Sequence, residues 1–114
     1  MKIRDAILSA QDVKSESVLV PEWNNSTVYI RTMSGTERSE FESAVYKDGK
    51  VETANFYAEL LVRCLADDKG ALIFTSADVA ALSAKSGSVL ARLAEVASRV
   101  NALSPKAESE AKKG

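Results

Sequence analysis

Residues 15–33 read SESVLVPEWNNSTVYIRTM, and this stretch decides the class of fold. Residues 15–20 and 27–33 carry apolar side chains at every second position, Val18 and Val20 in the first and Val28 and Ile30 in the second, which is typical of half-buried strands. Residues 21–26 between them hold a Pro and two Asn, and Asn tolerates the left-handed backbone that a chain reversal needs. The stretch therefore predicts a β-hairpin.

Helices are predicted on either side of the hairpin. Residues 1–10 place Ile3 and Ile7 four apart on one helical face, and we expect this short helix to be a lid on the core. After the hairpin, the hydroxyls of residues 34–36 can cap a helix that runs through Phe41 to Val45. The turn Lys47-Asp48-Gly49-Lys50 ends it.

A longer, more apolar helix should follow this turn. It can open at Thr53 or Asn55 and reach about Leu65, which puts Phe56, Leu60 and Cys64 on one stripe. A helix this apolar is expected to be central.

The last third of the chain predicts two more helices. Residues 71–75 form an apolar run that is either a third strand or a linker packed on the core. Ser76 can cap a short helix, and residues 86–88 separate it from a final helix that extends to about Leu103. Pro105 cannot continue that helix, and we expect residues 104–114 to be a disordered polar tail.

Length and composition fit one domain. A chain of 114 residues, 46% hydrophobic and 27% charged, is long enough for one modest core. We therefore expect a single α+β domain over residues 1–103, in which a small, mainly antiparallel sheet is covered by four to five helices.

The charge balance and hydropathy argue against several partners. The formal net charge is −1, with 15 basic and 16 acidic residues, so no electrostatic footprint for nucleic acid is present. No apolar stretch is long enough to span a bilayer, and no signal peptide is visible, so we expect a cytoplasmic protein.

The cysteine and histidine counts narrow the chemistry further. The chain has one Cys and no His, which removes Ser-His-Asp, Cys-His and His-metal sites. We therefore predict that the protein is not an enzyme and needs no cofactor or metal.

The remaining polar candidates are better explained as structure. Cys64 is expected to be a core residue because no Lys or Arg stands one turn away to lower its pKa. The Asp67-Asp68 pair before Gly70 is expected to form a turn. The acidic residues Glu37, Glu40 and Glu42 are expected to form a solvated helix face.

Partner-binding candidates lie in two places. Trp23 in the hairpin turn either folds back onto the sheet or stands out as an anchor. In the last helix, apolar residues recur with 4-3-4-3 spacing from Val89 to Leu103, a seam that suits the core or a partner helix. The candidate binding residues are Trp23, Leu90, Leu93, Val96 and Val100.

Two stretches resemble the tail assembly chaperones of long-tailed bacteriophages. The first is V-x-V-P-E-W at residues 18–23, then a strand and S-G-T-E-R at residues 34–38. The second is F-T-x-x-D-V at residues 74–79, then R-L-x-x-V-A-x-R-x-N at residues 92–101. The family's usual Gly-Gly after the Trp is Asn24-Asn25 here, and a frequent aromatic in the last helix is Ala94. Asn is the next-best residue to Gly at positive φ, so the first change is physically benign.

The resemblance implies a small protein of the host cytoplasm that binds the tape measure protein and is absent from the finished tail. It also implies that a frameshift often makes a minor extended form, whose extra domain engages the tail tube protein. Residues 112–114 are Lys-Lys-Gly, which an A-rich slippery run of codons could encode, so we expect a frameshift site there. Self-association remains open. The alternative is a structural tail-completion or connector protein that persists in the virion.

Overall fold

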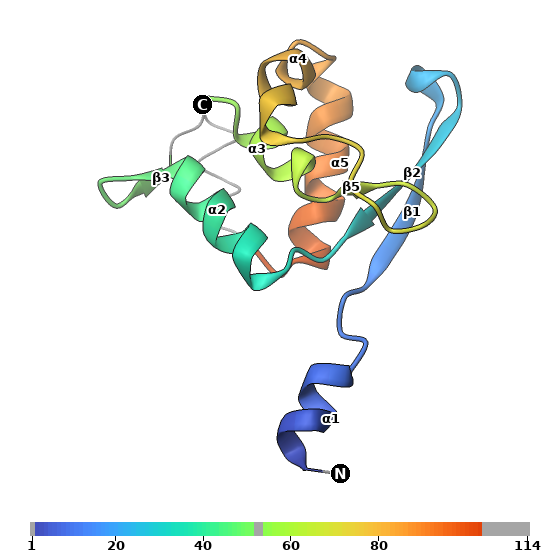
Figure 1. Cartoon of the computed structure of the whole chain (residues 1–114). Coiled ribbons are helices and arrows are strands. Elements are labelled where there is room, and N and C mark those ends of the chain that lie inside the picture. The colour runs from blue at the N-terminus through green and yellow to red at the C-terminus, as the bar shows by residue number, and fades with distance from the viewer. Residues whose placement is uncertain (1, 52–53, 104–114) are drawn as a thin grey trace.

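The computed structural model describes residues 2–51 and 54–103 and has an α+β fold (Figure 1), as predicted. The tail at 104–114 and Thr53 lie outside the described residues. The α-helices are α1 (Ile3–Ser9), α2 (Gly35–Val45), α3 (Phe56–Val62), α4 (Val79–Ser83) and α5 (Gly87–Val100). The strands are β1 (Ser15–Val20), β2 (Ser26–Arg31), β3 (Tyr46–Lys47), β4 (Lys50–Val51) and β5 (Leu65–Ala66). Two short 3-10 helices are η1 (Pro21–Trp23) and η2 (Ser76–Asp78).

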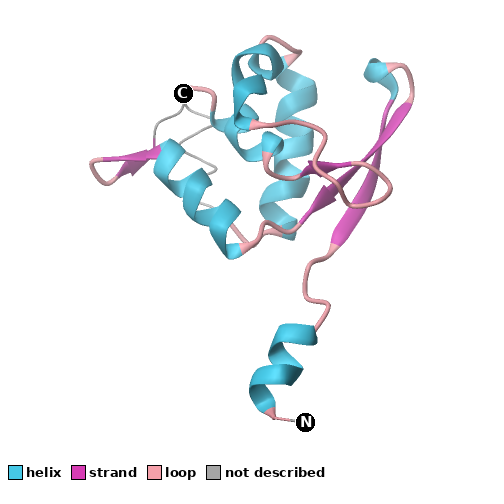
Figure 2. Cartoon of the chain, in the orientation of Figure 1, coloured by secondary structure: helices cyan, strands magenta, loops and turns pink. Residues whose placement is uncertain are grey.

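The predicted hairpin forms the larger sheet together with β5. β1 and β2 pair antiparallel, with Val18 opposite Val28, and β2 pairs antiparallel with β5 on its other side. Figure 2 shows the long two-stranded ribbon that results. Val20, Val28 and Ile30 are buried on the face that packs against α5, because alternate residues of a strand share a face.

The start of α2 follows from the sequence expectation. The Ser34 side chain accepts a hydrogen bond from the Glu37 amide, and the Glu37 carboxylate accepts one from the Ser34 amide. This reciprocal pair satisfies two donors that a helix start leaves free. α2 ends at Val45, shortly before the predicted turn at residues 47–50, and that turn joins β3 to β4 with Asp48 and Gly49 both at positive φ.

The central helix is shorter than predicted. α3 ends at Val62, not near Leu65, and the third strand is Leu65–Ala66 rather than residues 71–75. The amides of Arg63 and Cys64 donate to oxygens three residues back, those of Leu60 and Leu61, which closes the last turn of the helix. The Cys64 oxygen then accepts from the Arg31 amide at 2.9 Å, where the chain joins β2. Residues 71–73 lie alongside β5 and contribute a single bridge through Leu72.

The core lies between the sheet and the helices. α5 packs against β1 and β2 and also against α3, and α2 packs on the far side of α3. Phe41 of α2 and Phe56 of α3 meet edge to face with ring centroids 5.6 Å apart. The largest side chains with less than 2% exposure include Phe41, Ile30, Leu60, Leu61, Leu65 and Leu93. The expectation that α3 is central is confirmed.

The expectation that the first helix is a lid was wrong. α1 forms at the predicted place but projects away from the rest of the chain (Figure 1), and none of its residues is buried. Ile3, Ile7 and Leu8 are 76%, 63% and 68% exposed. An apolar stripe predicts that a helix has a side to bury, but it does not say which surface buries it.

The last helix also ends earlier than predicted, at Val100 rather than Leu103. Ala102 turns into the left-handed conformation at φ 52°, and the Leu103 amide donates back to the Ser98 oxygen at 2.9 Å. This arrangement satisfies the end of the helix before Pro105 is reached.

Candidate partner-binding site

Two arginines of α5 hold the hairpin onto the core. Arg92 donates two hydrogen bonds to the Glu22 carboxylate, at 3.0 and 2.8 Å, and Arg99 donates two to Glu16, at 3.0 and 2.7 Å. Charge-assisted bonds from Arg92 lower the pKa of Glu22 to about 2. The pKa of Glu16 is lowered by the same kind of contact with Arg99. The hairpin and α5 are thus connected at two points.

The hairpin turn gives Trp23 a defined position. Pro21 opens η1, and Asn24 and Asn25 adopt the left-handed conformation at φ 57° and 55°. The expectation that Asn supplies this backbone is confirmed. Trp23 is half-buried and packs against the core, so it folds back instead of standing free.

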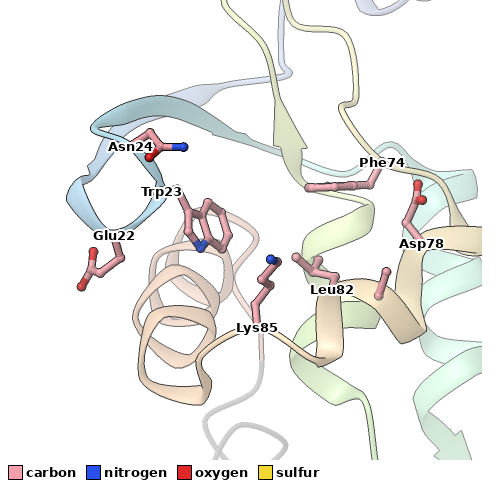
Figure 3. Close-up of a pocket in the computed structure, with 8 residues that line it drawn as sticks. Glu22, Trp23, Asn24, Phe74, Asp78, Leu82 and Lys85 are labelled. Atoms are coloured by element: carbon pink, nitrogen blue, oxygen red, sulfur yellow. The ribbon is translucent and has the colours of Figure 1, made fainter.

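A pocket opens beside Trp23, with a volume of about 370 Å³. Figure 3 shows side chains that face it from the hairpin turn, from the segment before η2 and from α4. Trp23, Phe74, Ala81 and Leu82 supply its apolar surface. Its polar lining residues are Glu22, Asn24, Asp78 and Lys85. We call it the Trp23 pocket.

The position of Phe74 depends on local hydrogen bonds around it. The Ile73 amide donates to the Leu65 oxygen at 3.0 Å, which ties this segment to the sheet. Thr75 then caps η2, because its hydroxyl accepts from the Ala77 amide and its own amide donates to the Asp78 carboxylate at 2.8 Å. The expected cap was Ser76, so the true cap lies one residue earlier.

The structure separates the predicted binding residues. Trp23 lines the pocket, whereas Leu90 and Leu93 are only 4% and 0% exposed. These two leucines are core residues, which is one of the two roles predicted for the seam, and they share the buried face of α5 with Val89, Ala94 and Ala97. This burial does not support their assignment as partner-binding residues. Val96 and Val100 stay half-buried at the surface, outside the Trp23 pocket.

Sequence reasoning missed the role of Asn101. Its Oδ1 accepts from the Met33 amide at 2.7 Å, and its Nδ2 donates to the Ala97 oxygen at 2.9 Å and lies 3.5 Å from the Cys64 sulfur. Asn101 is only 7% exposed, so these hydrogen bonds lie inside the protein. They join the end of α5 to the segment that follows β2. Asn101 lies within the helix predicted to reach about Leu103, and its partner Met33 is far away in the sequence, so no local pattern indicates the contact.

The other polar candidates have structural positions. Burial raises the pKa of the Cys64 thiol to about 12, although Cys64 follows α3 instead of lying within it. The Asp67 carboxylate accepts from the amides of Lys69 and Ala71, so the turn expectation is confirmed. Glu37 is not simply solvated, since it pairs with Arg31 as well as capping α2.

Two absences can be stated for the part of the chain that is described. Within residues 2–51 and 54–103, no three acidic or cysteine side chains converge as a set of metal ligands. No helix in these ranges has the length and apolar character needed to cross a membrane.

The sequence profile of the phage tail assembly chaperones matches residues 2–113, which is nearly the whole chain. The chain belongs to this family. A solved structure of the tail assembly chaperone of bacteriophage HK97 has a similar fold, with a TM-score of 0.63 and 20% sequence identity. The match covers 85% of this chain and 91% of that one. No curated protein sequence matches the chain.

Three residues of the stretch that resembles the family have structural contacts within this chain. Arg92, Arg99 and Asn101, all in the stretch that resembled the family, make contacts within this chaperone to Glu22, to Glu16 and to Met33. These three residues are part of the framework that positions the hairpin.

Proposed function

We propose that this chaperone binds the tape measure protein in the host cytoplasm during tail assembly and is not retained in the finished virion. Membership of the tail assembly chaperone family over residues 2–113 carries the proposal. Exposed apolar side chains on α1 and the open apolar pocket beside Trp23 support it, because a protein that protects an aggregation-prone partner must offer apolar surface to it.

Co-expression tests the binding. With this chaperone present, the tape measure protein of the same phage should remain in the supernatant after centrifugation, and a tag on either protein should recover both. Equal aggregation of the tape measure protein with and without the chaperone would refute the proposal.

Mass spectrometry of purified virions tests whether the protein leaves the tail. We expect peptides of the tape measure protein and none of this chain. A stoichiometric amount of this chain in the particle would favour the alternative of a tail-completion or connector protein.

A longer form is part of the proposal. We propose that a −1 frameshift near Lys112 and Lys113 makes a minor extended product, and that its extra domain engages the tail tube protein. The gene sequence tests this, because a slippery codon run and an overlapping reading frame without a start codon must both be present. Absence of either feature would leave the tube protein without this route of recruitment.

A further inference from the structure

The Trp23 pocket combines an apolar lining with hydrogen-bond donors that the described chain leaves without acceptors. The Trp23 indole N–H and the Lys85 ammonium make no hydrogen bond or ion pair to any residue within 2–51 and 54–103. Of the two carboxylates at the pocket, Glu22 is paired with Arg92, whereas Asp78 accepts from the neutral Thr75 amide and keeps its charge. Figure 3 places the Asp78 carboxylate near Phe74 and the Lys85 ammonium beside Trp23, and the two form no ion pair. On the Lys85 side, the pocket can therefore accept an apolar group that has a negatively charged group next to it.

The pocket is also held in place before any partner arrives. Trp23 packs against the core, the half-exposed Glu22–Arg92 ion pair adds a contact between its turn and α5, and the cap of η2 orders the segment that carries Phe74. Leu82 forms part of the lining and is 4% exposed, so its side chain is already packed. A site whose walls are fixed loses less conformational entropy on binding, which raises affinity for a given contact area.

We propose that the Trp23 pocket is the docking site for a segment of the tape measure protein in which a large apolar side chain is flanked by an Asp or Glu. The apolar side chain enters between Trp23 and Phe74, and the carboxylate accepts from Lys85 at the rim. This inference rests on the proposed function and specifies where on this chain the partner binds.

Charge argues against α1 of a second copy as the occupant. α1 carries exposed Ile3 and Ile7, but its one carboxylate, Asp5, already pairs with Arg4 at 2.9 Å. With Arg4 paired to Asp5, Lys2 would bring one unpaired cation toward Lys85, and like charges in contact are unfavourable. A partner with an unpaired carboxylate fits the pocket better.

Two adjacent alanines of α4 provide a matched test. Ala81 lines the pocket and Ala80 does not, and both are exposed, so Ala81→Phe fills the pocket while Ala80→Phe adds the same side chain outside it. The assay is the amount of co-expressed tape measure protein retained on the tagged chaperone. Ala81→Phe should lower it at least about fivefold, and Ala80→Phe should leave it within about twofold of wild type.

A charge reversal gives a second, surface-only test. Lys85→Glu should weaken retention about threefold or more and should reduce its sensitivity to added salt, because an attraction between opposite charges has been removed. Lys50→Glu on β4 makes the same change away from the pocket and should have no effect. Circular dichroism melts of all four variants check that each one folds.

The outcomes separate this inference from the proposed function. If the wild-type chaperone retains no tape measure protein, the proposed function fails. If the wild type retains it and both pocket variants do so equally well, the pocket is not the docking site and the proposed function stands. If Ala81→Phe instead lowers the mass of a wild-type oligomer in light scattering without changing retention, the pocket binds a second copy and the proposal is overturned.

Discussion

Replacing Asn101 by Ala tests whether one buried side chain joins α5 to the sheet. The change removes the oxygen that the Met33 amide donates to at 2.7 Å, and Met33 is only 6% exposed, so the amide is left without a partner. Leaving a buried donor unsatisfied costs about 1–3 kcal/mol, and losing the bond from Nδ2 to the Ala97 oxygen costs about 0.5–1.5 kcal/mol more. We expect the free energy of unfolding to fall by about 1.5–4.5 kcal/mol.

Ser98→Ala is the matched control on the same helix. Ser98 is 4% exposed, and its hydroxyl has no hydrogen-bond partner within the described ranges. Removing it should leave the free energy of unfolding unchanged or raise it by up to about 1 kcal/mol, because no bond is lost and Ala favours the helix.

Urea unfolding followed by Trp23 fluorescence measures both changes. In a thermal melt, each kcal/mol of change in the free energy of unfolding should shift the melting temperature by about 4 °C for a chain of this size. If Asn101→Ala stays within about 0.5 kcal/mol of wild type, or if Ser98→Ala costs as much as Asn101→Ala, the reasoning from buried hydrogen bonds is wrong.

Three further predictions follow from the burial and the charges. Deleting residues 2–10 should change the free energy of unfolding by less than about 0.5 kcal/mol in urea melts, because α1 buries no residue. In NMR titrations the Glu22 carboxylate should show a pKa near 2, and Arg92→Gln should return it toward 4.5; an unchanged value would exclude Arg92 as the cause. The Cys64 thiol should react with a disulfide reagent only in denaturant. The pKa of this thiol is raised from 9.0 to about 12 in the folded state, so loss of its proton favours the unfolded chain. The contribution of the buried thiol to the free energy of unfolding is therefore complete below pH 9 and is lost as the pH rises from 9 toward 12. Urea melts at alkaline pH would detect this loss.

The sequence predicts those parts of the fold whose cause is local. The hairpin follows from alternation around PEWNNS, and the start of α2 follows from Ser34 and its neighbours, since both depend on residues a few positions apart. The end of α3 could not be predicted, because residues 64–66 leave the helix to pair with β2, which is distant in the sequence. The packing of α1 could not be predicted either, since periodicity identifies an apolar face without its partner.

The residues of the candidate site could also be predicted only in part. Trp23 was identified because a lone Trp in a turn is a common binding anchor. Phe74 and Lys85 were missed because the pocket joins residues 74–85 to the hairpin turn, which lies far earlier in the sequence. For Leu90 and Leu93 the sequence left both the core and a partner helix open, because a 4-3-4-3 seam looks the same in the two cases.

The central place of β2 has a consequence for the order of folding. Its pairing with β1 closes a short loop and can form as soon as the hairpin has been synthesised, whereas its pairing with β5 must wait for α2 and α3. The apolar face of the hairpin then stays uncovered until α5 is made, because α5 is the helix that packs on β1 and β2. During synthesis we therefore expect this apolar face to be exposed until α5 follows and Asn101 bonds to Met33.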